Sequence, residues 1–154
     1  MALLIPALLS KHGFAHYEIS NYAKKGEECR HNLRYWRGEE YFGFGVAAHS
    51  FIGGERFYNG EGLEAYLAAP TRAEAGREAV EDAAYEYVML RLRLAEGIRE
   101  EDHLRRFGVR FSEKYRAVLD KYLPSGHILE EEGAYRLSEA GMRVSNAILV
   151  EMLP

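Results

Sequence analysis

The chain has 154 residues, of which 47% are hydrophobic and 29% are charged, and these fractions are typical of a soluble globular domain that buries a core. Its formal net charge of −4 excludes a general attraction to phosphate groups, so a nucleic-acid role would need a local basic patch, and the sequence contains no obvious one. A single cysteine, Cys29, excludes an internal disulfide framework and cannot by itself hold zinc or an iron–sulfur cluster.

The chain is predicted to begin with a helix followed by a strand. Residues 2–12 carry apolar side chains on most sides, as in a helix that a neighbouring element covers, and Gly13 ends it. This stretch has no basic start and is too short to span a bilayer, so it is interpreted neither as a signal peptide nor as a membrane anchor. Residues 16–22 alternate in character and predict a strand, and a helix followed by a strand is half of a βα repeat.

A glycine-rich segment is predicted to form the next two strands. Residues 41–51 are expected to be one strand in which Gly43 and Gly45 alternate with larger residues. One face of that strand is therefore nearly bare, and a ligand or another backbone must approach it closely. The Gly-Gly pair at positions 53–54 predicts a hairpin turn, with residues 55–59 as the returning strand.

The composition changes after residue 62. Aromatic residues, glycines and histidines are concentrated in the first 60 positions, whereas the remainder is rich in alanine, leucine, arginine and glutamate. We therefore predict a boundary between residues 59 and 71, which divides the chain into domains at 1–62 and 63–154.

The second domain is predicted to be mainly helical. After a short helix over residues 63–68, a T-x-x-E capping box at Thr71 and Glu74 predicts a helix that ends at Gly97. The elements expected beyond it are a helix over residues 99–106, a helix from Ser112 to Tyr122, a hairpin with its turn at Gly133, and a last helix capped by Ser138. This order resembles a winged-helix module. Its hairpin tip is acidic, so we expect packing or partner contact rather than phosphate contact.

The strongest candidate site is the block H-N-L-R-Y-W at residues 31–36. The His31 imidazole is able to ligate haem iron, while the Tyr35 and Trp36 rings cover a macrocycle and the Asn32 amide fixes its edge. The alternative is structural, with the two rings packed in a domain seam and the other two side chains capping backbone groups. The residues alone favour this structural alternative.

Further candidate residues lie on both sides of that block. Glu18, Ser20 and Asn21 at a strand end would hydrogen-bond a polar cofactor, since the carboxyl ends of barrel strands carry ligand sites. His49 is a candidate ligand or acid–base group, although a core histidine is the favoured reading. A nucleophile and base formed by Ser20 and His49 lacks a nucleophile elbow and an orienting acid, so hydrolase chemistry is disfavoured. Cys29 is interpreted as an ordinary free cysteine rather than a low-pKa thiol.

Three blocks carry a resemblance to a known family. They are, in chain order, Y-E-I-S-N-Y-A, C-R-H-N-L-R-Y-W and G-F-G-V-A-A-H-S-F, and the terminal R-L-S-E-A-G-M-R-V-S-N-A-I fits the same family. Nearly the whole chain resembles the second half of the radical S-adenosylmethionine family of oxygen-independent coproporphyrinogen III oxidases and their HemW-type relatives. The H-N-x-x-Y-W residues point to the HemW branch, whose members are regarded as haem chaperones.

The resemblance implies an α+β fold class. Residues 1–62 would supply terminal strands of an incomplete (β/α) radical-SAM barrel, and residues 63–154 a mainly helical, winged-helix-like C-terminal domain. Cofactor contacts are expected from His31, Asn32, Tyr35, Trp36, Glu18, Ser20, Asn21, Gly43, Gly45, Ala47 and His49, with His31 as the metal ligand. No catalytic residue is assigned, because the family's C-x-x-x-C-x-x-C motif for a [4Fe–4S] cluster and S-adenosylmethionine is absent. The chain is therefore expected to be a fragment that cannot perform radical chemistry alone, which leaves enzymatic activity open.

Three functions follow from the resemblance and the residues. The leading one is haem binding and delivery by the C-terminal part of a HemW-like protein, with haem or porphyrin and a haem-accepting protein as partners. The first alternative is an oxygen-independent coproporphyrinogen III oxidase, and the second is a non-catalytic interaction module. Exposed barrel edges predict self-association, and the composition predicts a cytoplasmic protein with no nucleic-acid partner and no transmembrane segment.

Overall fold

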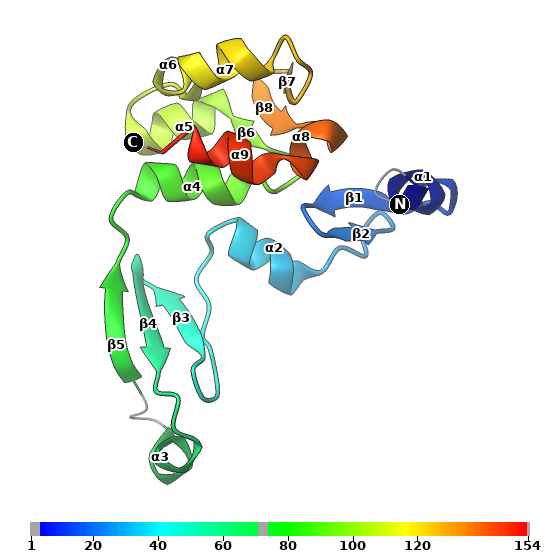
Figure 1. Cartoon of the computed structure of the whole chain (residues 1–154). Coiled ribbons are helices and arrows are strands. Elements are labelled where there is room, and N and C mark those ends of the chain that lie inside the picture. Colours follow the sequence, from blue (N-terminus) through cyan, green and yellow to red (C-terminus); the bar gives the residue numbers. More distant parts are fainter. Residues whose placement is uncertain (1–3, 71–73, 154) are drawn as a thin grey trace.

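The computed structural model describes residues 4–70 and 74–153, which fold as a mixed α/β protein with three separate small sheets (Figure 1). The helices are α1 Leu4–Lys11, α2 Arg30–Trp36, α3 Leu63–Ala68, α4 Ala83–Arg91, α5 Glu100–Phe107, α6 Phe111–Lys114, α7 Arg116–Tyr122, α8 Glu139–Arg143 and α9 Ser145–Val150. The strands are β1 Ala15–Glu18, β2 Asn21–Ala23, β3 His49–Ile52, β4 Glu55–Asn59, β5 Glu74–Ala79, β6 Ile98–Arg99, β7 Ile128–Glu131 and β8 Ala134–Leu137. Within the described ranges each sheet is open, and none closes into a barrel. The described helices include none with the length and apolar character needed to cross a membrane.

The hydrophobic core lies in the C-terminal part, where α4 to α9 pack around the β6-β8-β7 sheet (Figure 1). Phe111 is 0% exposed and its ring lies 5.1 Å from that of Tyr115 and 5.2 Å from that of Tyr135, between centroids. Val88 and Ile148 are also fully buried. Because complete burial of such a side chain contributes about 1.5–3 kcal/mol, this cluster holds most of the apolar stabilisation of the molecule.

The hairpin predicted around Gly133 is confirmed. β7 and β8 pair antiparallel up to Glu131 and Ala134, and the two residues between them, Glu132 and Gly133, have φ values of 49° and 74°. Two successive positive φ values are those of a type I′ turn, which fits the twist of a two-stranded ribbon. β6 then pairs with the other edge of β8. The likeness to a winged-helix module stays a prediction.

Two helices predicted as continuous are each divided in two. α6 and α7 are separated at Tyr115, with φ −111° and ψ 26°, and α8 and α9 at Val144, with φ −116° and ψ 18°. Ser138 is confirmed as a cap, because its hydroxyl oxygen accepts the Gly141 N–H at 3.1 Å. The Ser112 hydroxyl is not a cap and donates to a carboxylate of α5. Neither break contains proline or glycine, so packing decides both breaks and no local signal marks them.

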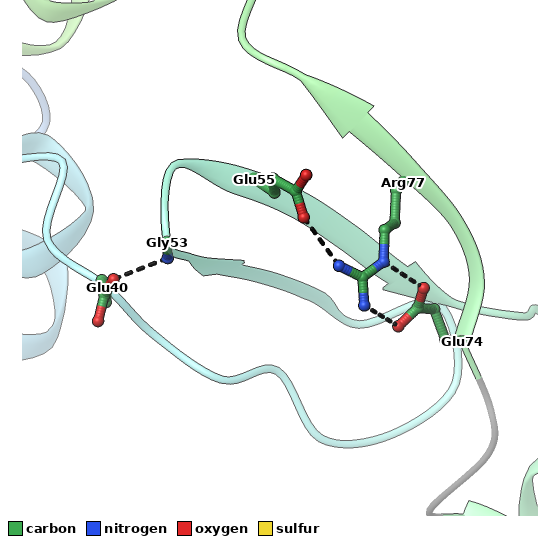
Figure 2. Close-up of polar contacts among 5 residues, drawn as sticks. All are labelled: Glu40, Gly53, Glu55, Glu74 and Arg77. Atoms are coloured by element: carbon green, nitrogen blue, oxygen red, sulfur yellow. Dashed lines mark hydrogen bonds and ion pairs between the residues drawn. The ribbon is translucent and has the colours of Figure 1, made fainter.

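The hairpin of β3 and β4 is confirmed, and a third strand adds to it. β3 pairs antiparallel with β4 across Gly53 and Gly54, whose φ values are 61° and 80°. β5 then pairs antiparallel with the other edge of β4. The guanidinium of Arg77 on β5 pairs with Glu74 at 2.7 Å and with Glu55 at 2.8 Å (Figure 2). These carboxylates, Glu74 first, raise the pKa of Arg77.

The helix predicted to begin at the Thr71 and Glu74 capping box is wrong. Residues from Glu74 onward form β5, because pairing with β4 outweighs the local helix signal, and Thr71 lies outside the described residues. The helix begins later, as α4, where the Asp82 carboxylate accepts the Tyr85 N–H at 2.8 Å. The β3-β4-β5 sheet thus includes residues on both sides of the predicted boundary at 62 and 63, which stays a prediction.

The single strand predicted over residues 16–22 is also wrong. The chain turns back at Ile19, and β1 and β2 pair antiparallel as a short hairpin. The Ile19 N–H donates to the Arg93 carbonyl at 2.8 Å, and the Ala95 N–H donates to the Tyr17 carbonyl at 3.1 Å. These backbone bonds hold the hairpin against the segment that follows α4, which the alternation of the sequence did not indicate.

The helix predicted at the start is confirmed as α1. Its apolar side chains are exposed, with Leu4 at 71%, Ile5 at 51% and Leu8 at 59%. Figure 1 shows α1 beside β1 and β2, at the opposite side of this hairpin from the helical cluster. Nothing within residues 4–70 and 74–153 buries this apolar face. The sequence predicted a helix of this kind, whose apolar side chains need a neighbouring element to cover them.

Candidate functional site

The candidate site is organised by α2, the helix that carries the H-N-L-R-Y-W block. His31 and Tyr35 are one helical turn apart and therefore share a face. The Tyr35 hydroxyl lies 2.9 Å from His31 Nε2, and the two rings meet edge to face with 4.7 Å between centroids. Tyr35 also contacts the Tyr41 ring edge to face at 4.5 Å. The helix thus presents an imidazole in contact with the Tyr35 ring, which in turn meets the Tyr41 ring edge to face.

That face of α2 opens onto a hollow of about 450 Å³. The hollow is lined by His31, Tyr35, Tyr41, Phe42, Gly43, Phe44, Ala48 and His49. His31 comes from α2 and His49 from the first residue of β3, so two imidazoles from separate elements line one hollow. His49 is exposed, and its ring lies 5.3 Å from that of Tyr58 on β4. The favoured reading of His49 as a core histidine is therefore wrong, because the residue is exposed.

The wall between the two histidines is a loop, and the strand predicted over residues 41–51 is wrong for most of its length. Only Tyr41, in an isolated bridge to Phe51, and the residues of β3 have strand pairing. The Gly43 N–H donates to the buried Ser50 hydroxyl at 3.0 Å. A Cβ atom added at Gly43 would lie 2.1 Å from the His49 carbonyl oxygen. The close approach predicted at the bare glycines is therefore made at Gly43 by the chain's own backbone.

Further bonds fix the rest of the loop. Gly45 has φ 112°, its N–H donates to the Tyr66 hydroxyl at 2.9 Å, and its carbonyl accepts from the Asn59 side chain at 2.8 Å. Ala47 has φ 55°, a conformation that is costly for a residue with a Cβ, and its N–H donates to the Gly60 carbonyl at 3.1 Å. Gly45 and Ala47 shape the loop without lining the hollow.

Trp36 and Asn32 lie apart from the hollow. Trp36 is five residues beyond His31 and faces another side of α2. It lines a separate cavity of about 350 Å³ between α2, the β3-β4 turn and α4, with the Arg93 guanidinium 5.4 Å from its ring centroid. Asn32 is half-buried and lines neither hollow. The position of Trp36 agrees with the structural alternative of packing at a seam.

The Y-E-I-S-N residues form a local cluster of their own. The Glu18 carboxylate is 0% exposed and accepts the Ser20 N–H at 3.2 Å and the Asn21 side-chain amide. None of the three lines the hollow between His31 and His49. Their expected contact with a cofactor stays a prediction, and within this chain they stabilise the turn between β1 and β2.

Sequence reasoning missed the aromatic part of the hollow. Tyr41, Phe42 and Phe44 line it, and Phe42 and Phe44 are 63% and 86% exposed. Their alternation with glycine was interpreted as a strand with one bare face. No local sequence signal marks this loop, because the exposure of the rings and the positive φ values of Gly45 and Ala47 are visible only in the structure. Glu40 holds the neighbouring β3-β4 turn, because its carboxylate accepts the Gly53 N–H at 2.7 Å (Figure 2).

The comparisons with known proteins all concern one group of relatives. Residues 79–144 match the family model described as HemN C-terminal domain. The heme chaperone HemW of Bacillus subtilis is 34% identical, in an alignment that covers 94% of this chain and 40% of the relative. HemW of Mycobacterium tuberculosis H37Rv is 42% identical over 75% of this chain and 30% of the relative, and HemW of Escherichia coli is 31% identical over 92% and 39%. The chain thus spans between 30% and 40% of the length of these three relatives.

The fold is similar to that of a solved structure. The structure described as "Coproporphyrinogen III oxidase (HemN) from Escherichia coli is a Radical SAM enzyme" matches with a TM-score of 0.73 and 16% sequence identity. The match covers 97% of this chain and 39% of that one. At this identity the likeness concerns the fold alone.

Proposed function

Because the chain belongs to the HemN and HemW family, we propose that it binds haem and serves in haem delivery, with His31 as the iron ligand. The observation that carries the proposal is the single hollow lined by His31, His49 and a set of aromatic rings. The relatives named heme chaperone support delivery of haem over coproporphyrinogen oxidation.

The donor set of the hollow fits haem better than a bare metal ion. The described part of the chain has no group of three or more histidine, cysteine, aspartate or glutamate side chains able to hold a metal ion. Haem needs no such group, because the porphyrin supplies four nitrogen ligands and the protein adds only one or two axial ligands. In this proposal His31 would supply one such ligand, and His49, which lines the same hollow, would supply a second or contact the macrocycle.

The surroundings of the imidazole suit a flat apolar ring. Tyr35 contacts His31 and Tyr41 contacts Tyr35, and the exposed Phe42 and Phe44 complete the aromatic lining of the hollow. Rings stack on aromatic faces or meet their edges, and burial of exposed phenylalanine by a macrocycle is favourable. Bound haem would bring an iron able to take axial ligands and electrons. The chain's own residues position it and exclude water from one of its faces.

The Tyr35 hydroxyl has a further role in this proposal. It lies against His31 Nε2, so it holds the imidazole in a fixed orientation before haem binds. An iron bound at this nitrogen would require the Tyr35 hydroxyl to release it, and the cost would be that of one exposed hydrogen bond, about 0.5–1.5 kcal/mol. Trp36 is proposed to support α2 from the side of the α4 cavity instead of covering the macrocycle.

The cluster and S-adenosylmethionine of the family belong, in this proposal, to another part of the full-length protein. The chain contains one cysteine, the exposed and free Cys29, whereas a [4Fe–4S] cluster is held by several thiolates. We propose that the exposed apolar face of α1, with Leu4, Ile5 and Leu8, meets that part or a second copy of the chain. A cytoplasmic location and a haem-accepting protein are further parts of the proposal.

The test is a titration of the chain with ferric haem, followed by the Soret band. We expect a shift of the band with the natural sequence and its loss or strong reduction in His31→Ala, with a smaller effect in His49→Ala. His12→Ala is the matched control, because His12 is exposed and lies beyond the end of α1, outside the hollow. An unchanged shift in His31→Ala would overturn the ligand assignment, and no shift in the natural chain would overturn haem binding.

A further inference from the structure

The face of α2 next to the aromatic hollow carries a row of arginines. Arg30, Arg34 and Arg37 follow the spacing of one helical face, and with Leu33 and Glu39 they line a groove of about 460 Å³. We call this the arginine groove. His31 lines both the arginine groove and the aromatic hollow. The proposed iron ligand therefore lies on the border between an aromatic surface and a cationic one.

Two of the three guanidinium groups are available to a ligand. Arg37 donates to the Glu96 carboxylate at 3.4 and 3.3 Å, so its charge is already paired. Arg34 has one exposed pair with Glu39 at 3.8 Å, which is long for a hydrogen bond, and a bond to a backbone carbonyl. Arg30 has no carboxylate within 4 Å among residues 4–70 and 74–153.

The position of Arg30 is unfavourable for the helix itself. It is the first residue of α2, whose first turn contains no acidic residue. A cation at a helix N-terminus opposes the helix dipole, at a cost of about 0.3–1 kcal/mol. The protein as a whole has a net charge of −4, so a stripe of three arginines also departs from its average surface. An anion bound in the arginine groove would offset the unfavourable cation at the N-terminus of α2 and neutralise the local positive charge.

We infer that Arg30 and Arg34 bind the propionate carboxylates of the haem whose iron is bound by His31. This inference rests on the proposed function and deepens it. Haem has an apolar macrocycle with two carboxylates on one edge. Of the two surfaces that meet at His31, the aromatic hollow suits the macrocycle and the arginine groove suits the carboxylates. Guanidinium groups bind carboxylates through paired N–H···O bonds, which fix orientation as well as charge. The macrocycle then covers the aromatic hollow, and its carboxylate edge lies over the arginine groove.

The test compares ferric haem with its dimethyl ester, in which both propionates are methylated. Both are titrated, in the same detergent, into the natural chain and into the Arg30→Gln/Arg34→Gln variant. We expect the ester to bind the natural chain about 10-fold more weakly than haem, as the loss of two largely exposed ion pairs predicts. The variant is expected to bind haem about 10-fold more weakly and the ester with unchanged affinity. Arg110→Gln/Arg116→Gln removes the same charge from two exposed positions, one just before α6 and one at the start of α7, and is expected to leave both affinities unchanged.

Each outcome separates this inference from the proposed function. Equal binding of haem and ester by the natural chain overturns the inference and leaves haem binding intact. A variant that loses affinity for both compounds to the same extent also overturns it, because the arginines would then act on the fold of α2. A Soret shift with neither compound overturns the proposed function and this inference together. Far-UV circular dichroism of both double variants checks that the chain remains folded.

Discussion

The two parts of this chain are stabilised in different ways. The buried hydrophobic cluster lies entirely between Tyr87 and Met152, in the C-terminal part. In the described residues up to 79, only Glu18, Ala23 and Ser50 are buried, and two of these three are polar. The C-terminal part has a core of its own, whereas the N-terminal part is held by strand pairing and by contacts with its neighbour. The candidate site belongs to the part without a core.

A few polar contacts join the two parts. Arg56 on β4 pairs with Glu86 on α4, the Ile19 N–H donates to the Arg93 carbonyl at 2.8 Å, and His16 on β1 pairs with Glu139 on α8 at 2.8 Å. Figure 1 shows the β3-β4-β5 sheet extending away from the helical cluster, so its position depends on such contacts near one end. The C-terminal part is therefore stabilised by its own packed core, and the N-terminal part by its contacts with the C-terminal part. We expect the two parts to respond to different substitutions.

The largest effect is expected from Phe111→Ala. Phe111 is 0% exposed in the centre of the core, and truncation of such a residue costs about 3–5 kcal/mol of unfolding free energy. Urea denaturation followed by far-UV circular dichroism measures the change. Phe44→Ala is the control, because Phe44 is 86% exposed and its loss is expected to stay within about 0.5 kcal/mol. Similar losses of unfolding free energy in the two variants would contradict the conclusion that the core lies in the C-terminal part.

The next largest effect is expected from Gly43→Ala, in the site. The new Cβ would lie 2.1 Å from the His49 carbonyl oxygen, so the loop must move away from β3 at a local cost of about 1–3 kcal/mol. We expect weaker haem binding in the Soret titration, while the urea midpoint of the helical part is unchanged. Gly60→Ala is the control, since its Cβ would be in ordinary contact with Ala75 at 3.7 Å. A lower midpoint for the helical part would show that the two parts unfold together.

A smaller effect is expected at the joint between the sheet and α4. The Arg56 and Glu86 side chains are 30% and 18% exposed, and Glu86, through its hydrogen bond, raises the pKa of Arg56. A double-mutant cycle with Arg56→Met and Glu86→Gln is expected to give a coupling energy of about 1 kcal/mol. Faster hydrogen exchange in β3, β4 and β5, with unchanged protection in α4 to α9, would be the structural sign. No coupling would mean that strand pairing and loop contacts alone position the sheet.

The smallest effect is expected from Tyr115→Phe. The Tyr115 hydroxyl is buried without a hydrogen-bond partner among the described residues, so its removal is expected to stabilise the chain by ~0.5 kcal/mol at neutral pH. Burial, with the charges of Asp82 and Tyr85 added, raises the pKa of Tyr115 to about 12.

That pKa also gives the sign of the alkaline response. Between about pH 10 and pH 12 the unfolded chain releases the Tyr115 proton while the folded chain keeps it, so stability falls as the pH rises through this window. Tyr115→Phe is expected to make this fall shallower, measured as urea midpoints from pH 9 to pH 12. An equally steep fall in the variant would exclude Tyr115 as a contributor.

The elements that the sequence predicted well are those with local signals. The turns at Gly53-Gly54 and Gly133 and the end of α5 at Gly108 all require positive φ, which glycine provides. The strand β5 and the breaks at Tyr115 and Val144 depend on partners far along the chain, and the residues there carry no such signal. Capping motifs show the limit of such local signals. Ser138 caps a helix as predicted, whereas Glu74, predicted to belong to a helical capping box, lies in the strand β5.

Four of the residues that line the candidate site were predictable from the sequence, and the shape of the site was not. His31, Tyr35, Gly43 and His49 were expected together and do line one hollow. Helical spacing, which is a local property of the sequence, explains why His31 and Tyr35 lie together. The separation of Trp36 from His31 also follows from helical spacing, because residues five apart lie on different sides of a helix. This separation was not predicted, because the whole H-N-x-x-Y-W motif was interpreted as one site. The aromatic wall depends on a loop whose conformation is set by Ser50, Tyr66 and other residues outside the loop itself.

Trp36, the only tryptophan of the chain, has one more consequence. It lies on α2, whose other face carries the proposed iron ligand, and the Arg93 guanidinium beyond α4 covers its ring at 5.4 Å. Its fluorescence is therefore a single-site optical signal placed where the two parts of the molecule meet. A porphyrin bound at His31 would quench that emission by energy transfer, and separation of the two parts would shift its wavelength as water reaches the indole. One cuvette measurement on the natural chain can then distinguish ligand binding from opening of the joint.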